Sequence, residues 1–598
     1  MLDPTPSECV PAGLRLGDFA TITEALDYAA QGPSGFNFYS GRGELVERLP
    51  YRDLRDQAQS FARRMLRAGL RKGDRLAVLA ETTGDFARIF FACQYAGIIP
   101  VPLPLPTSFG GRGVYEARIR RLLEGCGASG LLSSEEFSSL LAPAGRDLSL
   151  KILGALDVLG SVPEDGVDLP SARETELCYL QFSSGSTRFP QGVSVTHRAL
   201  MSNAAGISQW GLQVRPGDRC VSWLPFYHDM GLVGFFLAPL ASQLSVDYLA
   251  TRDFARRPMA WLNILSRNGG TISYSPSFGY DLCGRWAATT PPNGIDLSRW
   301  RIAGIGGDMV RPQILERFAD AFASVGFDAK AFVASYGMAE TTLAVSFAPL
   351  GSGIEVDCID LNRLEKENVA IPVAGTDGAH ERGMPRTRSF VVCGRVLPDM
   401  ELEVRADDGT SLGDRGVGTI WVRGPSVMEG YYGRPEETAQ ALSADGWLNT
   451  GDVGYKLDGA IVIVGRRKDL IIVNGRNIAP QDLEWSAEQV SGVRPGDVAA
   501  FSIDDDAKGT ERVVLLVQCR LQESNARADL ATQVGDAIRN SAGIECEVVL
   551  VPHQSLPYTS SGKLSRSQAK QKFLRGEHLV PNSRGGQGPE PRAAAGPR

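Results

Sequence analysis

The sequence is poor in the residues that build metal centres and disulfide frameworks. Its five histidines form no HxH or HExxH pattern, and its ten cysteines are scattered without a CxxC pair. These absences argue against a histidine-based metal site, a zinc knuckle and a set of structural disulfides. We therefore expect reduced, buried thiols in a cytoplasmic protein. Cys283 and Cys393 are interpreted as small core residues, because the sequence around them supplies no activating base.

Excess positive charge and long apolar runs are also lacking. The formal net charge is -7 and the pI is about 5.6, which argues weakly against non-specific binding of nucleic acid. No apolar stretch reaches the roughly 18 residues of a membrane span. The N-terminus, MLDPTPSECVPAGL, carries acidic residues and prolines where a signal peptide has a basic and then an apolar run. We expect neither a nucleic-acid partner nor a membrane span.

The length of 598 residues exceeds what one core supports, so two or more domains are expected. In the first two-thirds, buried-strand patterns alternate with amphipathic helical patterns. Strands are predicted at residues 75–80, 219–224 and 270–275, and helices at residues 85–96 and 312–323. This alternation predicts an α/β fold.

The pattern changes twice towards the C-terminus. Short alternating runs at 402–404 and 419–422, punctuated by Gly and Asp, predict a small β region. Beyond residue 465, strands at 498–503, 512–518 and 547–551 and a helix near 528–539 predict a separate α+β domain. We expect a large N-terminal domain over 1–464, a smaller one over 465–580, and a disordered tail rich in Gly, Pro and Arg over 581–598.

One loop, residues 180–197 with the sequence LQFSSGSTRFPQGVSVTH, is the richest in possible ligand groups. The apolar run 177–182 leads into it and alternating residues 193–195 lead out, which predicts a loop between two strands. Its hydroxyls and glycines are typical of a phosphate cradle, in which backbone amides approach an anion. No Gly-Lys-Ser/Thr follows, so it is not the common P-loop. On composition alone, a flexible Ser/Gly surface turn is an equal alternative.

Four further motifs follow in order: SWLPFYHDMGL at 222–232, SYGMAETTL at 335–343, TGDVGY with GRRKDLIIVNGRNI at 450–478, and YTSSGKLSR at 558–566. With these motifs, residues 21–575 resemble the adenylate-forming superfamily of acyl-CoA synthetases, peptide-synthetase adenylation domains and luciferases. The fatty acyl-AMP ligases match best. Arg188 stands where most of the superfamily has Gly, Gln191 stands where Lys is usual, and residues 351–388 resemble the insertion that separates these ligases from CoA ligases. Without the resemblance, 351–388 reads as an ordinary surface loop.

The resemblance implies a site for ATP and Mg²⁺. Tyr336 would stack on adenine, Glu340 would bind Mg²⁺, and Asp452 would accept both ribose hydroxyls, with Arg466 as an added donor. The β- and γ-phosphates would be held by Ser184, Gly185, Ser186 and Thr187. The remaining implied nucleotide contacts are Gly306, Gly307, Asp308, Ser335, Gly337, Met338 and Thr341. Asp308 and Met309 depart from the Glu-Pro pair that is more usual at this turn, and Ser183 replaces a common Thr.

Three further residues have implied catalytic or conformational roles. Lys563 would reach the substrate carboxylate and the α-phosphate, although a solvated Lys in a Ser-Gly turn is the commoner fate of such a residue. His228 would lie beside the carboxylate, whereas an isolated histidine in an aromatic segment is more often a packing residue. Lys468 matches the hinge about which the superfamily swings its C-terminal domain. Such a mobile domain would carry Lys563 out of the site after adenylation.

The implied reaction is the ATP-dependent activation of a fatty acid to an acyl-adenylate with release of pyrophosphate. The acyl group would then pass to the phosphopantetheine thiol of an acyl carrier protein or polyketide-synthase carrier domain, which would act in trans because no carrier domain follows residue 575. The implied acyl tunnel runs beside Trp223, Gly231, Gly234, Phe278, Gly279 and Tyr280. A long-chain fatty acyl-CoA synthetase is the first alternative, and a non-catalytic nucleotide-binding module is a second from a different class.

Overall fold

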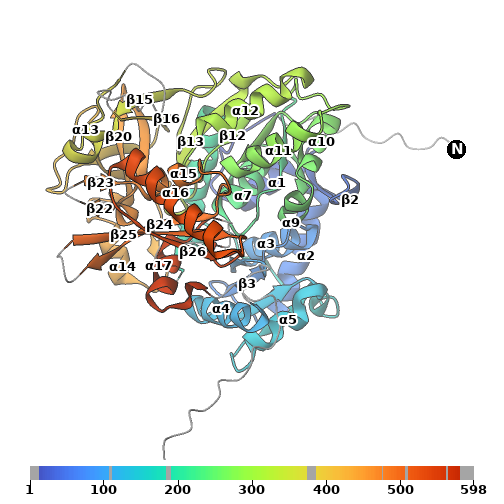
Figure 1. The fold of residues 1–598 in the computed structure, drawn as a ribbon. Coiled ribbons are helices and arrows are strands. Elements are labelled where there is room, and N and C mark those ends of the chain that lie inside the picture. Colours follow the sequence, from blue (N-terminus) through green and yellow to red (C-terminus); the bar gives the residue numbers. More distant parts are fainter. Residues whose placement is uncertain are drawn as a thin grey trace, which may run out of the picture. The chain divides into compact units, whose positions relative to one another are not determined.

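The computed structural model describes residues 13–106, 111–183, 190–373, 386–473, 476–505, 510–559 and 563–579 (Figure 1). These residues form two compact units. The first unit comprises residues up to 105 and residues 122–479, and the second comprises residues 106–121 and those from 480 onward. The units therefore part between Ala479 and Pro480, whereas the sequence pattern placed the domain boundary after residue 464.

The first unit contains one large mixed sheet. Its parallel half has the order β13 (Phe332–Gly337), β12 (Ile302–Ile305), β11 (Ile272–Ser275), β9 (Arg219–Ser222), β10 (Ser245–Leu249) and β1 (Gly35–Tyr39), with β2 (Leu45–Pro50) antiparallel at the edge. Its antiparallel half continues from β13 through β14 (Ala344–Phe347), β16 (Thr387–Val396), β21 (Ala460–Arg466), β20 (Leu448–Leu457) and β18 (Gly418–Arg423) to β17 (Glu401–Arg405). The strand β15 (Val356–Asp360) also pairs with β16.

The remaining sheets of the first unit are small. A parallel sheet contains β4 (Ile99–Leu103), β3 (Arg75–Leu79), β5 (Gly130–Ser133) and β6 (Ile152–Ala155). An antiparallel sheet contains β19 (Gly430–Tyr431), β8 (Gly192–Thr196) and β7 (Leu177–Phe182). A two-stranded ribbon contains β22 (Ile471–Val473) and β23 (Arg476–Ile478).

Helices of ordinary length and single helical turns connect these strands. The longer ones are α1 (Ile22–Ala29), α2 (Tyr51–Arg67), α3 (Gly84–Ala96), α5 (Glu135–Gly145), α6 (His197–Ala205), α10 (Met259–Asn268), α11 (Ser277–Thr289) and α12 (Pro312–Phe322). The shorter ones are α7 (Asp229–Leu232), α8 (Ala238–Ala241), α9 (Thr251–Arg256), α13 (Leu361–Glu367) and α14 (Pro435–Ala441). The helix α4 (Gly111–Cys126) has residues in both units.

The predicted βα units are confirmed. The strand β3 and the helix α3 form where an apolar run is followed by an amphipathic pattern, and Leu76 to Leu79 are all buried. The Thr83 side chain caps the first turn of α3, and Gly97, with a φ of 66°, ends the helix, because both residue types suit those positions. The helix α12 begins at Pro312 as predicted and lies beside α11 (Figure 1).

The core between α11, α12 and the parallel strands is aromatic. The ring of Tyr280 lies 5.6 Å from that of Trp261 and 5.1 Å from that of Phe318. Its hydroxyl donates a hydrogen bond to the carbonyl oxygen of Gly304 at 2.8 Å. Edge-to-face contacts of this kind add to the stabilisation that burial supplies.

The second unit is an α+β structure, as the sequence predicted. Its sheet has the order β24 (Val498–Asp505), β25 (Thr510–Cys519) and β26 (Glu547–Pro552). Its helices are α15 (Pro480–Ala487), α16 (Ser524–Ala542) and α17 (Arg566–Leu574). The Glu484 carboxylate on α15 accepts hydrogen bonds from Arg566 Nε and Nη2, both at 2.7 Å. This paired interaction fixes the start of α17.

A buried carboxylate joins the insertion-like segment to the ribbon that precedes the second unit. Glu365 on α13 is 1% exposed. Its Oε2 accepts a hydrogen bond from Arg476 Nε of β23 at 2.8 Å and from Arg386 Nη1 at 3.2 Å. Two cations thus share one buried anion, and both would lose this charge partner if the anion were removed.

Replacing Glu365 with Ala is therefore expected to lower the free energy of unfolding by about 3 kcal/mol, the cost typical of breaking a buried ion pair. Urea denaturation followed by tryptophan fluorescence measures the change. The matched control is Glu367→Ala on the same helix, where the carboxylate is half exposed and paired with Arg363 at 2.8 Å. We expect that control to cost less than about 0.5 kcal/mol. Equal losses in the two variants would contradict the proposed importance of the Glu365 pair.

Candidate active site

The Ser- and Gly-rich loop predicted within residues 180–197, here termed the Ser/Gly loop, joins two antiparallel strands, as predicted. The strands β7 and β8 pair from Leu177 opposite Thr196 to Phe182 opposite Gly192. At the base of the loop, the Ser183 amide donates to the Gln191 carbonyl at 2.9 Å. The predicted phosphate ligands lie outside the described residues, as does Arg188; these ligands are Ser184, Gly185, Ser186 and Thr187.

A tight glycine turn after β12 lies against the start of the SYGMAETTL motif. A Cβ atom on Gly306 would stand 2.9 Å from both the carbonyl oxygen and Oγ of Ser335, so this approach requires glycine. Gly307 has a φ of 77°, and Asp308 Oδ1 accepts the Met309 amide at 2.8 Å. The structure thus brings the predicted turn and Ser335 together.

Three predicted nucleotide residues meet in one hydrogen-bonded group. Tyr336, at the end of β13, donates from its hydroxyl to Asp452 Oδ2 at 2.7 Å. Arg466 Nε lies 3.2 Å from Asp452 Oδ1, because Asp452 of β20 and Arg466 of β21 are register partners. Burial and the Asp452 charge raise the pKa of Tyr336 well above its usual value, so its hydroxyl remains a donor. Asp452 is 6% exposed.

The rest of the SYGMAETTL motif folds into a compact turn after β13. The Met338 amide donates to the Leu343 carbonyl at 2.8 Å, and Thr341 Oγ1 donates to the Met338 carbonyl at 3.0 Å. A Cβ atom on Gly337 would stand 1.8 Å from the Leu343 carbonyl oxygen, so the turn can close only over glycine at this position.

Glu340 projects from this turn, and its carboxylate is held by a residue that the sequence analysis missed. The Tyr431 hydroxyl donates to Glu340 Oε1 at 3.0 Å. Burial raises the pKa of the Glu340 carboxyl above its usual value. The motif GYYGRP around Tyr431 offers a Gly-Tyr pair before a Gly-Arg-Pro turn, and nothing in it marks a hydroxyl near a carboxylate.

The carboxylate of Glu340 suits Mg²⁺. This cation prefers hard oxygen ligands and is often bound through one or two carboxylates plus phosphate oxygens and water. Among the described residues, no cluster of three or more His, Cys, Asp or Glu side chains is arranged as a metal site.

His228 precedes the short helix α7 and pairs with its neighbour. Its Nδ1 lies 2.7 Å from Asp229 Oδ1, and the Met230 amide donates to the same carboxylate oxygen at 2.7 Å. On β7, Gln181 Nε2 donates to the Tyr227 carbonyl at 3.4 Å, which links the strand before the loop to this segment. The segment between β9 and α7, which carries the predicted histidine, is thus bonded to the strand before the loop.

The aromatic residues predicted to line an acyl tunnel differ in how far they are buried. Trp223 is buried, stacks on Phe254 at 3.8 Å, and meets Phe278 at 5.5 Å. Phe278 is 41% exposed, whereas Tyr280 belongs to the aromatic core described above. A Cβ atom on Gly279 would stand 2.1 Å from Ser275 Oγ.

The two other predicted tunnel glycines also face atoms of this chain. A Cβ atom on Gly231 would stand 2.2 Å from the Pro225 carbonyl oxygen, and one on Gly234 would stand 3.1 Å from Leu343 Cδ2. These glycines, like Gly279, permit close packing within the protein.

The two predicted lysines lie in short turns. Lys468 belongs to the single 3₁₀ turn Arg467–Asp469 between β21 and β22. Lys563 lies in the second unit, where its amide donates to Thr559 Oγ1 at 3.2 Å and its carbonyl accepts the Thr559 amide at 2.7 Å.

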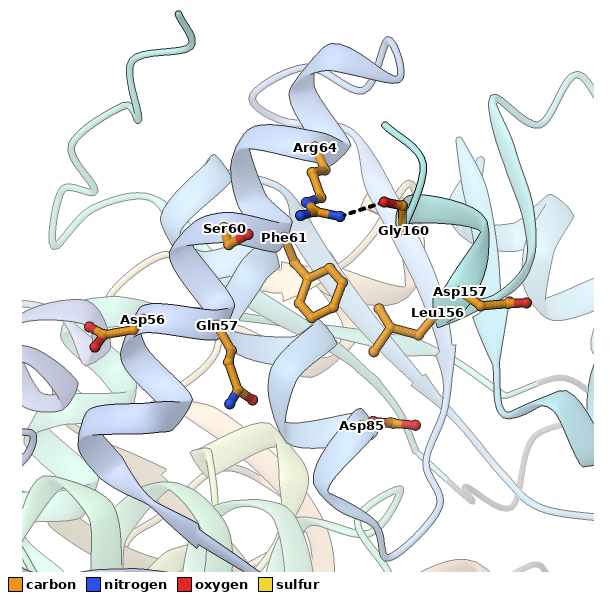
Figure 2. Close-up of a pocket in the computed structure, with 9 residues that line it drawn as sticks. All are labelled: Asp56, Gln57, Ser60, Phe61, Arg64, Asp85, Leu156, Asp157 and Gly160. Atoms are coloured by element: carbon orange, nitrogen blue, oxygen red, sulfur yellow. Dashed lines mark hydrogen bonds between the residues drawn. The ribbon is translucent and has the colours of Figure 1, made fainter. Parts of the chain in front are cut away.

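A hollow of about 600 Å³ lies elsewhere on the first unit. It is lined by α2, by Asp85 at the start of α3, and by residues 156–160 (Figure 2). At the hollow, Arg64 Nη1 donates a hydrogen bond to the Gly160 carbonyl oxygen at 2.8 Å. It contains none of the predicted site residues, so its size alone assigns it no role.

The chain is similar in sequence to known proteins. The family model for AMP-binding enzymes matches residues 29–432. A Caulobacter vibrioides protein, whose name proposes acyl-CoA synthetase activity, is 51% identical over 97% of this chain and 99% of its own length. The medium-chain-fatty-acid–[acyl-carrier-protein] ligase JamA of Moorena producens is 30% identical over 94% of this chain and 96% of its own length.

A solved structure shares both sequence and fold. It comes from a study of fatty acyl-adenylate ligases from E. coli and L. pneumophila, is 43% identical, and superimposes with a TM-score of 0.88 over 94% of this chain and 99% of its own. The chain belongs to the family of AMP-binding enzymes, which are adenylate-forming ligases. Among the helices of the described ranges, none has the length and apolar character that crossing a membrane would demand.

Proposed function

We propose that this protein is a fatty acyl-AMP ligase that passes its acyl group to a carrier protein. The observation that carries the proposal is the group formed by Tyr336, Asp452 and Arg466, with the Glu340 carboxylate on the turn that follows Tyr336. This group joins an aromatic face, a buried carboxylate and a guanidinium, which suit a ribonucleotide. The similarity to the fatty acyl-adenylate ligase structure supports a fatty acid as the second substrate.

The first step joins the two substrates. A carboxylate oxygen of the fatty acid attacks the α-phosphorus of ATP, the bond to the β-phosphate oxygen breaks, and pyrophosphate leaves. Asp452 would accept the ribose hydroxyls while Tyr336 fixes its orientation, and the loop at 184–187 would hold the departing phosphates. Such a step gains most from positioning and charge neutralisation, because it requires no covalent bond to the enzyme.

Three further residues would act on the charged groups of the two substrates. Glu340 would hold Mg²⁺, which supplies charge neutralisation at the phosphates when bound. Lys563 would stabilise the charge that develops between the carboxylate and the α-phosphate. His228, with Nδ1 turned to Asp229, would present its other ring nitrogen to the carboxylate site.

The second step would transfer the acyl group to a thiol with release of AMP. We infer that the thiol belongs to a carrier protein in trans, supported by the segment 351–388 and by the carrier-protein ligase JamA. The turn at Lys468 would serve as the hinge for the C-terminal domain between the two steps. The Caulobacter vibrioides relative favours the alternative, a fatty acyl-CoA synthetase.

A cytoplasmic location completes the proposal. Nine described cysteines are free of disulfides, and most of them are buried, including Cys283 and Cys393. Free thiols of this kind are typical of a reducing compartment.

Fatty-acid-dependent exchange of labelled pyrophosphate into ATP tests the first step. The protein is incubated with Mg²⁺, ATP, pyrophosphate and single fatty acids of increasing length, with no thiol acceptor. We expect exchange that depends on the fatty acid and peaks at one range of chain lengths. Nucleotide binding without such exchange would instead indicate a non-catalytic module.

A further inference from the structure

Residues 426–432, which we term the crosspiece, connect two parts of the proposed site. On one side, the Ser426 carbonyl accepts Thr342 Oγ1 at 2.8 Å, and the Met428 amide donates to the Glu340 carbonyl at 2.9 Å. The crosspiece is thereby fastened to the turn that carries Glu340.

On its other side, the crosspiece is fastened to the strand that leaves the Ser/Gly loop. The Glu429 amide donates to the Ser194 carbonyl at 3.1 Å, and the Tyr432 amide donates to the Gly192 carbonyl at 2.7 Å. Gly430 pairs opposite Ser194 in an antiparallel bridge between β19 and β8. The crosspiece therefore fixes the proposed cation ligand relative to the end of the proposed phosphate loop.

One side chain of the crosspiece reaches the carboxylate itself. The Tyr431 hydroxyl donates to Glu340 Oε1 at 3.0 Å. The Tyr431 amide donates to Thr438 Oγ1 at 2.9 Å, so the backbone of Tyr431 is anchored independently of its hydroxyl. The bonds that fasten the crosspiece to the Glu340 turn, to β8 and to Thr438 are made by backbone groups and by the hydroxyls of Thr342 and Thr438, so removing the Tyr431 hydroxyl leaves them intact.

We propose that Tyr431 is a positioning residue that fixes the Glu340 carboxylate for Mg²⁺. With Oε1 held by the tyrosine hydroxyl, the carboxylate keeps one orientation, and Oε2 is the oxygen left to meet the cation. Residues that hold a metal ligand in this way commonly change metal affinity 10- to 100-fold when they are removed. The inference rests on the proposed function, because it takes Glu340 as the Mg²⁺ ligand.

The test compares Tyr431→Phe with Tyr432→Phe. Both variants lose one phenolic hydroxyl from neighbouring, partly buried tyrosines, but the backbone amide of Tyr432, and not its hydroxyl, makes the bond to β8. Isothermal titration calorimetry measures the affinity for α,β-methylene-ATP, which cannot react at the α-phosphorus, with and without Mg²⁺. The ratio of the two affinities is the contribution of the cation to binding.

We expect Tyr431→Phe to reduce this ratio about ten-fold, and Tyr432→Phe to leave it within about two-fold of the wild-type ratio. The affinity for AMP in the absence of Mg²⁺ should stay unchanged in both, which shows that the nucleotide pocket is intact. An unchanged ratio in Tyr431→Phe, or equal reductions in the two variants, would overturn the inference.

Glu340→Gln separates failure of this inference from failure of the proposed function. Loss of the Mg²⁺ effect in Glu340→Gln but not in Tyr431→Phe would overturn the role of Tyr431 alone. Retention of the effect in Glu340→Gln would overturn the assignment of Glu340 as the cation ligand, and the role of Tyr431 with it. Where the inference holds, adding Tyr431→Phe to Glu340→Gln produces no further loss, because the hydroxyl acts through the carboxylate.

Discussion

Replacing Lys563 with Ala is expected to lower the rate of acyl-adenylate formation about a thousand-fold, the loss typical of removing one preorganised group that stabilises transition-state charge. The residue lies in a closed turn, in which its carbonyl accepts the Thr559 amide at 2.7 Å. The turn is held by backbone groups and Thr559, so the substitution should remove the ammonium group without unfolding the turn. Pyrophosphate exchange measures the rate, and calorimetry measures ATP binding.

The affinity for ATP should change less than about three-fold in Lys563→Ala, because the group acts mainly on charge that develops during the reaction. The control is Lys570→Ala on α17, a lysine seven positions along the same segment; it should keep the wild-type rate. A Lys563→Ala variant that retained more than a tenth of the activity would contradict the catalytic role. If the wild-type protein shows no exchange, and Lys563→Ala binds ATP as well as the wild type does, the result favours a nucleotide-binding module without catalytic activity.

Replacing Asp452 with Asn is expected to weaken ATP binding about a hundred-fold, as for loss of hydrogen bonds to a buried charged group. The carboxylate is 6% exposed, accepts the Tyr336 hydroxyl at 2.7 Å, and lies 3.2 Å from Arg466 Nε. An amide has one acceptor atom and no charge, so it cannot satisfy the tyrosine, the guanidinium and two ribose hydroxyls. Calorimetry with ATP and with 2′,3′-dideoxy-ATP measures the effect.

The wild-type protein should prefer ATP over the dideoxy analogue, and Asp452→Asn should lose most of that preference. The matched control is Asp458→Asn in the exposed turn between β20 and β21, where a φ of 49° suits Asn as well as Asp. It should bind both nucleotides as the wild type does. An Asp452→Asn variant that bound ATP weakly but kept its preference for the ribose hydroxyls would contradict the role assigned to Asp452.

Local patterns of the sequence predicted much of the fold. The helix α12 begins at Pro312, and the strands β7 and β8 flank the loop as their apolar periodicity indicated. These features depend on neighbours in the sequence, such as a proline in a first turn or alternating buried positions. The register that sets Asp452 opposite Arg466 spans fourteen positions and follows from one hairpin, so it too lies within reach of sequence reasoning.

Other features depend on contacts between distant segments. Tyr431 reaches Glu340 across 91 positions of sequence, and no periodic pattern connects the two. Glycines show a second limit. The resemblance places Gly231 and Gly279 beside an acyl tunnel, and that placement stays a prediction; the structure adds that a Cβ atom would stand 2.2 Å from the Pro225 carbonyl oxygen at Gly231 and 2.1 Å from Ser275 Oγ at Gly279. A sequence shows where a side chain is missing, and packing decides which atoms enter the space.

The most direct test of the central claim is mass spectrometry of the products formed from ATP, Mg²⁺ and a mixture of fatty acids. One reaction contains CoA, and the other contains a holo acyl carrier protein. We predict acyl-AMP in both reactions and an acyl thioester on the carrier protein alone. Ready formation of acyl-CoA would contradict the account and identify the protein as a fatty acyl-CoA synthetase.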